Sequence, residues 1–209
     1  MASITRCCKN RWVEWAGRAG AIAIFALLSG LASAQNATEI SQYQVERLED
    51  DIVISAQVAF ELPAAVEEAL LKGVPLYFVS EAEVLRERWY WYDKKISVVE
   101  RHLRLAYQPL TRRWRLNVTA GAGRDANLGL ALNQSFDTLA QVLSTIKRIS
   151  KWKIADAGDL DTNQKYKVEF RFRLDLSQLP RPFQIGALGQ SDWDIAASSS
   201  SALVLSAPK

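Results

Sequence analysis

The chain has 209 residues, with 26 basic and 23 acidic side chains, one histidine, two cysteines and one methionine. The basic excess lies in residues 1–34, which hold four of the basic residues and one of the acidic ones. Residues 35–209 are therefore electrically balanced and contain neither cysteine nor methionine. This excludes disulfides and thiolate sites there, and it gives no charge argument for a nucleic-acid or anionic-membrane partner.

Residues 1–34 have the organisation of a cleaved secretory signal peptide. A basic segment precedes the apolar run Ala19–Gly30, and Ala32-Ser33-Ala34 forms an A-x-A cleavage site. The apolar run is shorter than the roughly 20 residues that span a bilayer. We therefore expect cleavage after Ala34, export to the periplasm and no stable membrane anchor afterwards, which leaves a single β-rich domain over residues 35–197. The basic residues of the signal are Arg6, Lys9, Arg11 and Arg18.

The first predicted elements are a strand and a short helix. Apolar side chains alternate between Gln44 and Phe60, which predicts a strand. Pro63 suits a first helical turn and Gly73 suits the position just past a last turn, so a helix is predicted over residues 63–72.

Two hairpins are predicted over residues 76–119. In the first, a two-residue turn would place like charges opposite each other, which is destabilising. A three-residue loop over residues 93–95 instead opposes Glu87 to Arg101. In the second hairpin, a four-residue loop is predicted over residues 109–112. This loop would pair Tyr107 with Trp114, Leu105 with Leu116 and Leu103 with Val118.

These registers give the strands one apolar face and one polar face. The apolar face is rich in aromatic side chains, which are candidates to line a pocket for an apolar ligand, although a tightly packed core is the alternative. The polar face combines arginine and tyrosine, which favour partner recognition because both give large contact areas and hydrogen bonds. A face covered by the rest of the protein is the alternative there. The ligand-pocket candidates are Trp89, Trp91, Tyr107 and Trp114, and the partner-binding candidates are Arg86, Arg88, Tyr90 and Tyr92.

The C-terminal part predicts a helix followed by strands. Ser135 suits an N-cap and apolar residues recur at helical spacing, which predicts a helix over residues 135–149. A short strand is predicted over residues 152–155. A longer strand is predicted over residues 166–176, because apolar and charged residues alternate strictly there. Its charged stripe, expected to be solvated, is Lys167, Arg171 and Arg173.

The last segments are less regular. Residues 179–183 contain two prolines and are predicted to be extended or polyproline-like. A last strand is expected over residues 193–197, followed by a weakly ordered tail over residues 198–209. Together the elements predict a mainly β, α+β fold, a single antiparallel β-sandwich or curled sheet with two packed helices.

Four sequence strings, read together, resemble a known bacterial family. They are Gly73-Val74-Pro75-Leu76, Arg88-Trp89-Tyr90-Trp91-Tyr92-Asp93, Leu105-Ala106-Tyr107 with Leu110, and Leu179-Pro180-Arg181-Pro182-Phe183-Gln184. The family is domain of unknown function 4390, also labelled proline-rich signal peptide proteins, and the resemblance runs from about Val45 to Ile195. It implies an exported proteobacterial protein of uncharacterised function, often encoded near a membrane sensor kinase, and it implies no catalytic residues.

Three features of the sequence are candidate sites of chemistry. Residues 121–126 match a dinucleotide-binding pattern, but no βαβ unit follows them. Residues 159–163 begin like a calcium loop but lack its glycine and its bidentate acid. His102 is the only histidine and cannot build a multi-histidine zinc site. We therefore expect no catalytic residue, no metal and no cofactor.

Two functions remain as hypotheses. The first is a non-catalytic interaction or sensing module linked to envelope signalling, with a membrane sensor kinase or another envelope protein as its partner. The second is a periplasmic carrier of an apolar or lipid-like ligand, which a cavity between residues 85–118 and the helix at 135–149 would favour. A hydrolase is the weakest alternative, because no spacing of carboxylate, hydroxyl or lysine side chains singles out a catalytic pair.

Overall fold

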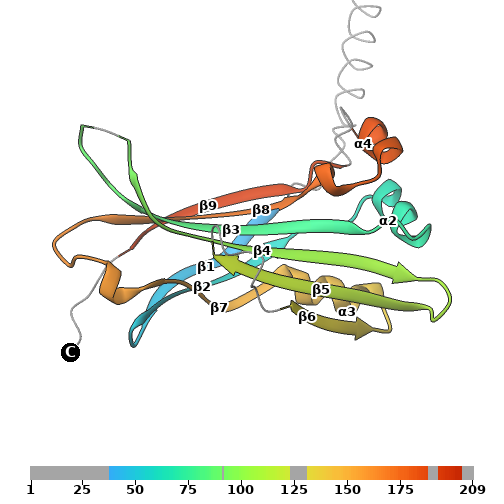
Figure 1. Ribbon diagram of the computed structural model, residues 1–209, viewed down its shortest axis with the longest axis horizontal. Coiled ribbons are helices and arrows are strands. Elements are labelled where there is room, and N and C mark those ends of the chain that lie inside the picture. The colour runs from blue at the N-terminus through green and yellow to red at the C-terminus, as the bar shows by residue number, and fades with distance from the viewer. Residues whose placement is uncertain (1–37, 91, 123–130, 188–192, 204–209) are drawn as a thin grey trace, which may run out of the picture. The chain divides into compact units, whose positions relative to one another are not determined.

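The computed structural model describes residues 38–90, 92–122, 131–187 and 193–203. Within these residues the chain forms two antiparallel β-sheets with three α-helices beside them (Figure 1). One sheet has three strands in the order β1–β2–β7, and the other has six strands in the order β6–β5–β4–β3–β8–β9. The prediction of a mainly β, α+β fold with antiparallel sheets is confirmed.

The strands are β1 (Glu39–Leu48), β2 (Asp51–Ala59), β3 (Leu76–Arg86), β4 (Lys94–Gln108), β5 (Arg113–Ala122), β6 (Ala131–Phe136), β7 (Arg148–Asp156), β8 (Tyr166–Leu174) and β9 (Ala196–Leu203). The α-helices are α2 (Ala64–Leu71), α3 (Leu139–Lys147) and α4 (Arg181–Ala187), and 3-10 turns span Ala157–Asp159 and Leu176–Gln178. None of the helices in the described residues has the length and apolar character needed to span a bilayer.

The hydrophobic core contains apolar side chains from both sheets. Strict alternation on β8 buries one side of the strand, and Phe172 there stacks on Phe78 of β3 with ring centroids 5.6 Å apart. Phe60, which follows β2 in the other sheet, packs 5.4 Å from Phe172. The three rings therefore join the two sheets, and each is no more than 4% exposed.

The first predicted strand is in fact a hairpin. Residues 44–60 were expected to form one strand, but the chain turns back at Glu49-Asp50, where Glu49 has a φ of 55°. Leu48 then pairs with Asp51, so β1 and β2 run antiparallel. The acidic segment forms the turn because it is exposed and has no apolar side chain to bury. The predicted helix over 63–72 is confirmed as α2, with Gly73 beyond its end at a φ of 87°.

The register predicted for the hairpin of β3 and β4 is wrong. β3 ends at Arg86 and β4 begins at Lys94, so residues 87–93 form the connection instead of residues 93–95. Arg101 pairs with Ser80, not with Glu87, and Glu81 stands opposite Glu100. The fully buried apolar side chains of β3 determine this register, and they outweigh two pairs of like charges, Glu81 with Glu100 and Arg86 with Lys94. These side chains include Leu76, Phe78, Ala82 and Val84.

The register of the second hairpin is confirmed. β4 and β5 are joined by residues 109–112, and Tyr107 pairs with Trp114, Leu105 with Leu116 and Leu103 with Val118. The apolar face of this hairpin is continuous with that of β3, because Leu103 also pairs with Phe78. Strands β3, β4 and β5 therefore share one continuous apolar surface across the centre of the six-stranded sheet.

The helix predicted over residues 135–149 is shorter and begins later. Residues 131–136 form strand β6 beside β5, and α3 begins at Leu139 with Thr138 as its N-cap. The Thr138 hydroxyl accepts a hydrogen bond from the Gln141 amide at 3.3 Å. The chain enters β7 directly at Arg148, so the strand expected over 152–155 is longer at both ends.

The C-terminal segments also differ from the prediction. Residues 181–187 form helix α4, whereas residues 179–183 were expected to be extended. Pro182 is compatible with a first helical turn, where its missing amide hydrogen leaves no intrahelical bond unmade. Strand β9 runs from Ala196 to Leu203 along β8, so residues 198–203 belong to the sheet and not to a weakly ordered tail.

Candidate functional site

The connection between β3 and β4 exposes aromatic side chains at one end of the six-stranded sheet. Trp89 is 93% exposed, Tyr92 is 88% exposed and Tyr90 is 70% exposed. The Trp89 and Tyr90 rings contact each other edge to face, with centroids 5.1 Å apart. We call the described residues of this connection, 87–90 and 92–93, the aromatic loop.

Hydrogen bonds donated by two backbone amides hold the aromatic loop. The Glu87 amide donates to the Lys165 carbonyl at 3.0 Å, which ties the start of the loop to the segment before β8. The Arg88 amide donates to Asp93 Oδ1 at 3.3 Å, which closes the loop on itself. The exposed rings therefore project from an anchored base.

Three of the four partner-binding candidates lie in the aromatic loop. Arg88, Tyr90 and Tyr92 are exposed there, together with Trp89. Arg86 is the last residue of β3, is partly buried and pairs with Lys94 and Tyr166 on the neighbouring strands. The predicted alternation of two faces fails here because these residues are not in a strand.

The ligand-pocket candidates are not brought together. Trp89 belongs to the aromatic loop, whereas Tyr107 and Trp114 pack against each other near the opposite end of β4, with ring centroids 4.7 Å apart. Trp114 is only 6% exposed and belongs to the core. Trp91 lies outside the described residues. The expected aromatic pocket wall is therefore not formed by Trp89, Tyr107 and Trp114.

A cavity of about 340 Å³ nevertheless opens between the six-stranded sheet and α3. Its walls come from β3, β4, β5 and β6 on one side and from α3 and the start of β7 on the other. Leu116 and Ile146 form part of its apolar surface, and Arg101 and Arg148 are the charged side chains that line it. This position corresponds to the one that the carrier hypothesis requires, but the residues are different ones.

Arg101 in this cavity does not have the partner that the sequence predicts. It was expected to pair with Glu87, but Glu87 lies in the aromatic loop and Arg101 points between the two sheets, with its guanidinium 4.7 Å from the centroid of Trp152 on β7. Burial lowers the pKa of Arg101. The available sequence signal was a charge in phase with Val99 and Leu103 on the apolar side of β4.

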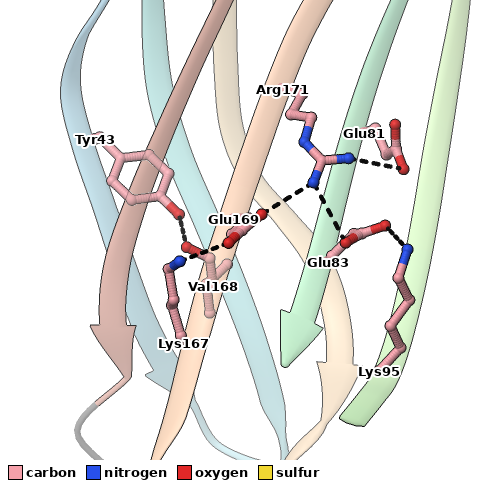
Figure 2. A network of polar contacts seen from close by, with 8 residues as sticks. All are labelled: Tyr43, Glu81, Glu83, Lys95, Lys167, Val168, Glu169 and Arg171. Carbon is pink, nitrogen blue, oxygen red and sulfur yellow. Dashed lines mark hydrogen bonds and ion pairs between the residues drawn. The ribbon is translucent and has the colours of Figure 1, made fainter. Parts of the chain in front are cut away.

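A network of ion pairs crosses the other face of the sheet (Figure 2). Arg171 on β8 lies 3.0 Å from Glu169, 3.7 Å from Glu83 and 3.9 Å from Glu81. Glu83 is 2% exposed and also pairs with Lys95 on β4. Lys167 pairs with Glu169 at 2.6 Å. The stripe of Lys167 and Arg171 is therefore engaged with carboxylates of β3 and β8 and is not simply solvated.

The network shifts the pKa values of its members. Partial burial raises the pKa of Glu81, and the neighbouring Glu83 carboxylate raises it further, while Arg171 acts in the opposite direction. The pKa of Glu169 is lowered, first by its hydrogen bond with Lys167. Tyr43 of β1 donates to the Val168 carbonyl at 3.0 Å, and burial raises the pKa of its hydroxyl. Each acid of the network forms an ion pair with a base.

His102 lies on the same outer face as this network, next to Glu100, with Nε2 and Oε2 3.1 Å apart. It pairs with Val79 and Thr119 across the sheet. In the part of the chain that the structure describes, no three histidine, cysteine or carboxylate side chains are grouped closely enough to hold a metal ion. The dinucleotide-like motif lies mostly outside the described residues, because residues 123–130 are among those not described.

Comparison with known proteins adds one finding. The model of a protein family described as Domain of unknown function (DUF4390) matches residues 35–202. A search of curated proteins and a search of solved structures each found no significant match.

Proposed function

The chain belongs to the DUF4390 family, and from this premise we propose that it is a non-catalytic periplasmic module that binds an envelope protein through the aromatic loop. The partner that the family resemblance suggests is a membrane sensor kinase. The role of the module is then interaction or sensing within envelope signalling.

The exposure of Trp89, Tyr90 and Tyr92 carries this proposal. Tryptophan, tyrosine and arginine dominate the binding energy of protein interfaces, because they combine large apolar area with hydrogen-bonding groups. All three residue types occur in the aromatic loop, with Arg88 beside the rings. Large apolar side chains that gather on a surface mark interaction sites more often than single exposed ones do.

Export is a second part of the proposal and is tested on its own. The signal features of residues 1–34 support cleavage after Ala34. We expect protein released from the periplasm of the native host to begin at Gln35, which mass spectrometry of the intact chain measures. A chain that still carries residues 1–34, or that fractionates with the cytoplasm, contradicts this part of the proposal.

The docking surface is tested by a loop variant and a matched surface variant. Trp89→Ala combined with Tyr92→Ala removes two exposed rings. The control is Leu110→Ala, because Leu110 is fully exposed in the connection between β4 and β5, at the other end of the same strand. We expect the loop variant to behave like a deletion strain in envelope-stress and kinase signalling assays, and the control to behave like the wild type.

Crosslinking in intact cells identifies the partner. A photoreactive amino acid at position 92 is expected to capture the sensor kinase or another envelope protein, whereas the same group at position 110 is not. Identical crosslinks from both positions, or normal signalling in the loop variant, contradict the proposal. If the protein binds protein-free lipid vesicles and the loop variant does not, the partner of the loop is a lipid surface and not a protein.

A further inference from the structure

We propose that the cavity between α3 and the six-stranded sheet binds a single-chain amphiphile with an anionic head group, held at its head by Arg101 and Arg148. The chemical class is a carboxylate or phosphate monoester that carries one acyl or alkyl chain. This site goes beyond docking through the aromatic loop, because it uses other residues and a different kind of ligand.

The walls of the cavity are mainly apolar. Leu103 and Leu116 on the sheet and Ile146 and Ile149 on the α3 side are each at most 5% exposed and form its deep surface. Toward the solvent the lining includes Leu132 of β6, which is 56% exposed. The cavity is therefore an apolar space with an open side, which suits an alkyl chain.

Arg101 supplies a cation inside this apolar space. Its guanidinium stacks on Trp152, and within the described residues it forms no hydrogen bond or ion pair with a carboxylate. A charge that is partly removed from water is unfavourable unless an opposite charge or hydrogen bonds compensate it. Burial indeed lowers the pKa of Arg101. A bound anion would supply the missing compensation.

Arg148 adds a second guanidinium at the exposed side. It lies where α3 passes into β7, and its Nε donates to Ser150 Oγ at 3.3 Å. Arginine binds carboxylates and phosphates through two parallel hydrogen bonds, which a single ammonium group cannot do. The cavity lining contains these two arginines and no acidic side chain, so its charge is complementary to an anion.

The volume limits the size of the ligand. Sites for small molecules usually measure about 300–1,000 Å³, and this cavity of about 340 Å³ is at the lower end of that range. One short or medium alkyl chain therefore fits better than the two chains of a phospholipid. A free inorganic anion would leave the apolar walls without a partner.

Binding is measured by isothermal titration calorimetry with four probes on the purified protein. Decanoate and decyl phosphate carry the two head groups, decanol lacks the charge, and acetate lacks the chain. We expect decanoate or decyl phosphate to bind at least about ten-fold more tightly than decanol, the difference that a charge-assisted hydrogen bond produces. The anion that binds with the higher affinity shows whether the site prefers a carboxylate or a phosphate head group.

Two arginines of β4 give a matched pair of variants. Arg101→Met removes the partly buried guanidinium of the cavity, whereas Arg104→Met removes one that also stacks on an aromatic ring, Tyr77, but on the outer face. We expect Arg101→Met to lower the affinity for decanoate at least about ten-fold and Arg104→Met to leave it unchanged. Ala120→Leu fills the cavity beside Arg101 with the charge retained, and it is expected to abolish binding.

Several outcomes overturn the proposal. They are absence of binding by both anionic probes, equal affinities for decanoate and decanol, equal affinities for decanoate and acetate, and unchanged affinity in Arg101→Met and Ala120→Leu. Circular dichroism of each variant confirms folding before titration. Because Arg101→Met and Ala120→Leu leave Trp89 and Tyr92 in place, failure of this proposal is separable from failure of the docking function.

Discussion

At the residue scale, Glu83 and Lys95 form an ion pair whose two members differ sharply in exposure. The Glu83 side chain is 3% exposed, whereas that of Lys95 is 61% exposed. Removing the lysine leaves a buried carboxylate whose remaining ion pair, among the described residues, is the longer one with Arg171 at 3.7 Å. Removing the charge of the glutamate leaves a lysine that is free to turn toward water.

This asymmetry predicts unequal effects of substitution. We expect Lys95→Met to lower the free energy of unfolding by about 1–3 kcal/mol, because it leaves a buried acceptor without its closest donor. Glu83→Gln keeps the shape of the side chain and is expected to lower it by less. Urea unfolding at neutral pH measures both values. A larger loss in Glu83→Gln than in Lys95→Met would show that the pair is not organised around the buried carboxylate.

Glu81 predicts a dependence of stability on pH. Its pKa is raised above 4.5, mainly by burial and then by Glu83. The folded protein therefore holds this proton more tightly than the unfolded chain does. The stabilising contribution is complete below the unfolded pKa and is lost as the pH rises through the folded pKa. Glu81→Gln is expected to gain stability relative to the wild type over that pH range.

The control for Glu81 is a carboxyl with the opposite shift. The hydrogen bond with Lys72 lowers the pKa of Glu68 in α2. Its contribution is present above the unfolded pKa and is lost as the pH falls through the folded pKa, so Glu68→Gln should lose stability relative to the wild type at neutral pH and not in acid. Urea unfolding across the acidic range distinguishes the two signs. The same pH trend in both variants would contradict the assignment of Glu81.

At the scale of elements, the start of α3 shows how an N-cap is misplaced from sequence alone. Ser135 and Thr138 are both N-cap residue types, and apolar residues at helical spacing follow either one. The choice depends on strand β6, which pairs with β5 from Ala131 to Phe136 and includes Ser135. That pairing is a tertiary contact, which local periodicity does not report.

Substitution of the two hydroxyl residues tests this assignment. Thr138→Ala removes the acceptor of the Gln141 amide and is expected to lower the free energy of unfolding by about 1 kcal/mol. Ser135→Ala is the control, and we expect little change because the side chain is exposed in β6. Chemical denaturation of both variants gives the comparison. An equal or larger effect at Ser135 would favour the earlier helix start.

The two central hairpins differ in how well the sequence predicts them. The register of β4 and β5 is predictable because apolar alternation continues up to both sides of a short loop. The connection between β3 and β4 is not predictable in the same way, because Trp89 and Tyr90 extend the alternating pattern past Arg86 although no partner strand buries them. The aromatic residues that look like strand interior are the candidate binding residues.

At the scale of the whole molecule, the order of strands is the part that sequence predicts least. Adjacent hairpins such as β4–β5 follow from local patterns, but β8 lies between β3 and β9, and β7 pairs with β2. The pairings of β8 with β3 and of β7 with β2 join segments that are far apart in the chain, so only packing of the complete core selects them. The cavity under α3 arises from the same packing, and for this reason local sequence patterns do not indicate the residues that line it.

Strand β9 leads to a prediction about the C-terminal residues. It pairs with β8 from Ala196 to Leu203 and covers an edge that would otherwise expose unpaired backbone groups. Deletion of residues 196–209 is therefore expected to lower the soluble yield and to cause aggregation, whereas deletion of residues 204–209 leaves every described strand intact. Size-exclusion chromatography separates these outcomes. Equal monomer yields from both deletions would indicate that β9 is dispensable.

The contrast between Trp89 and the buried tryptophans gives the protein an intrinsic optical reporter. Trp114, Trp152 and Trp193 are at most 7% exposed, while Trp89 is almost fully hydrated. Denaturation hydrates the three interior indoles and shifts fluorescence emission to longer wavelengths. Burial of Trp89 against another molecule shifts the emission to shorter wavelengths. The direction of the shift in tryptophan emission thus distinguishes complex formation from loss of the native state in one sample, without a label.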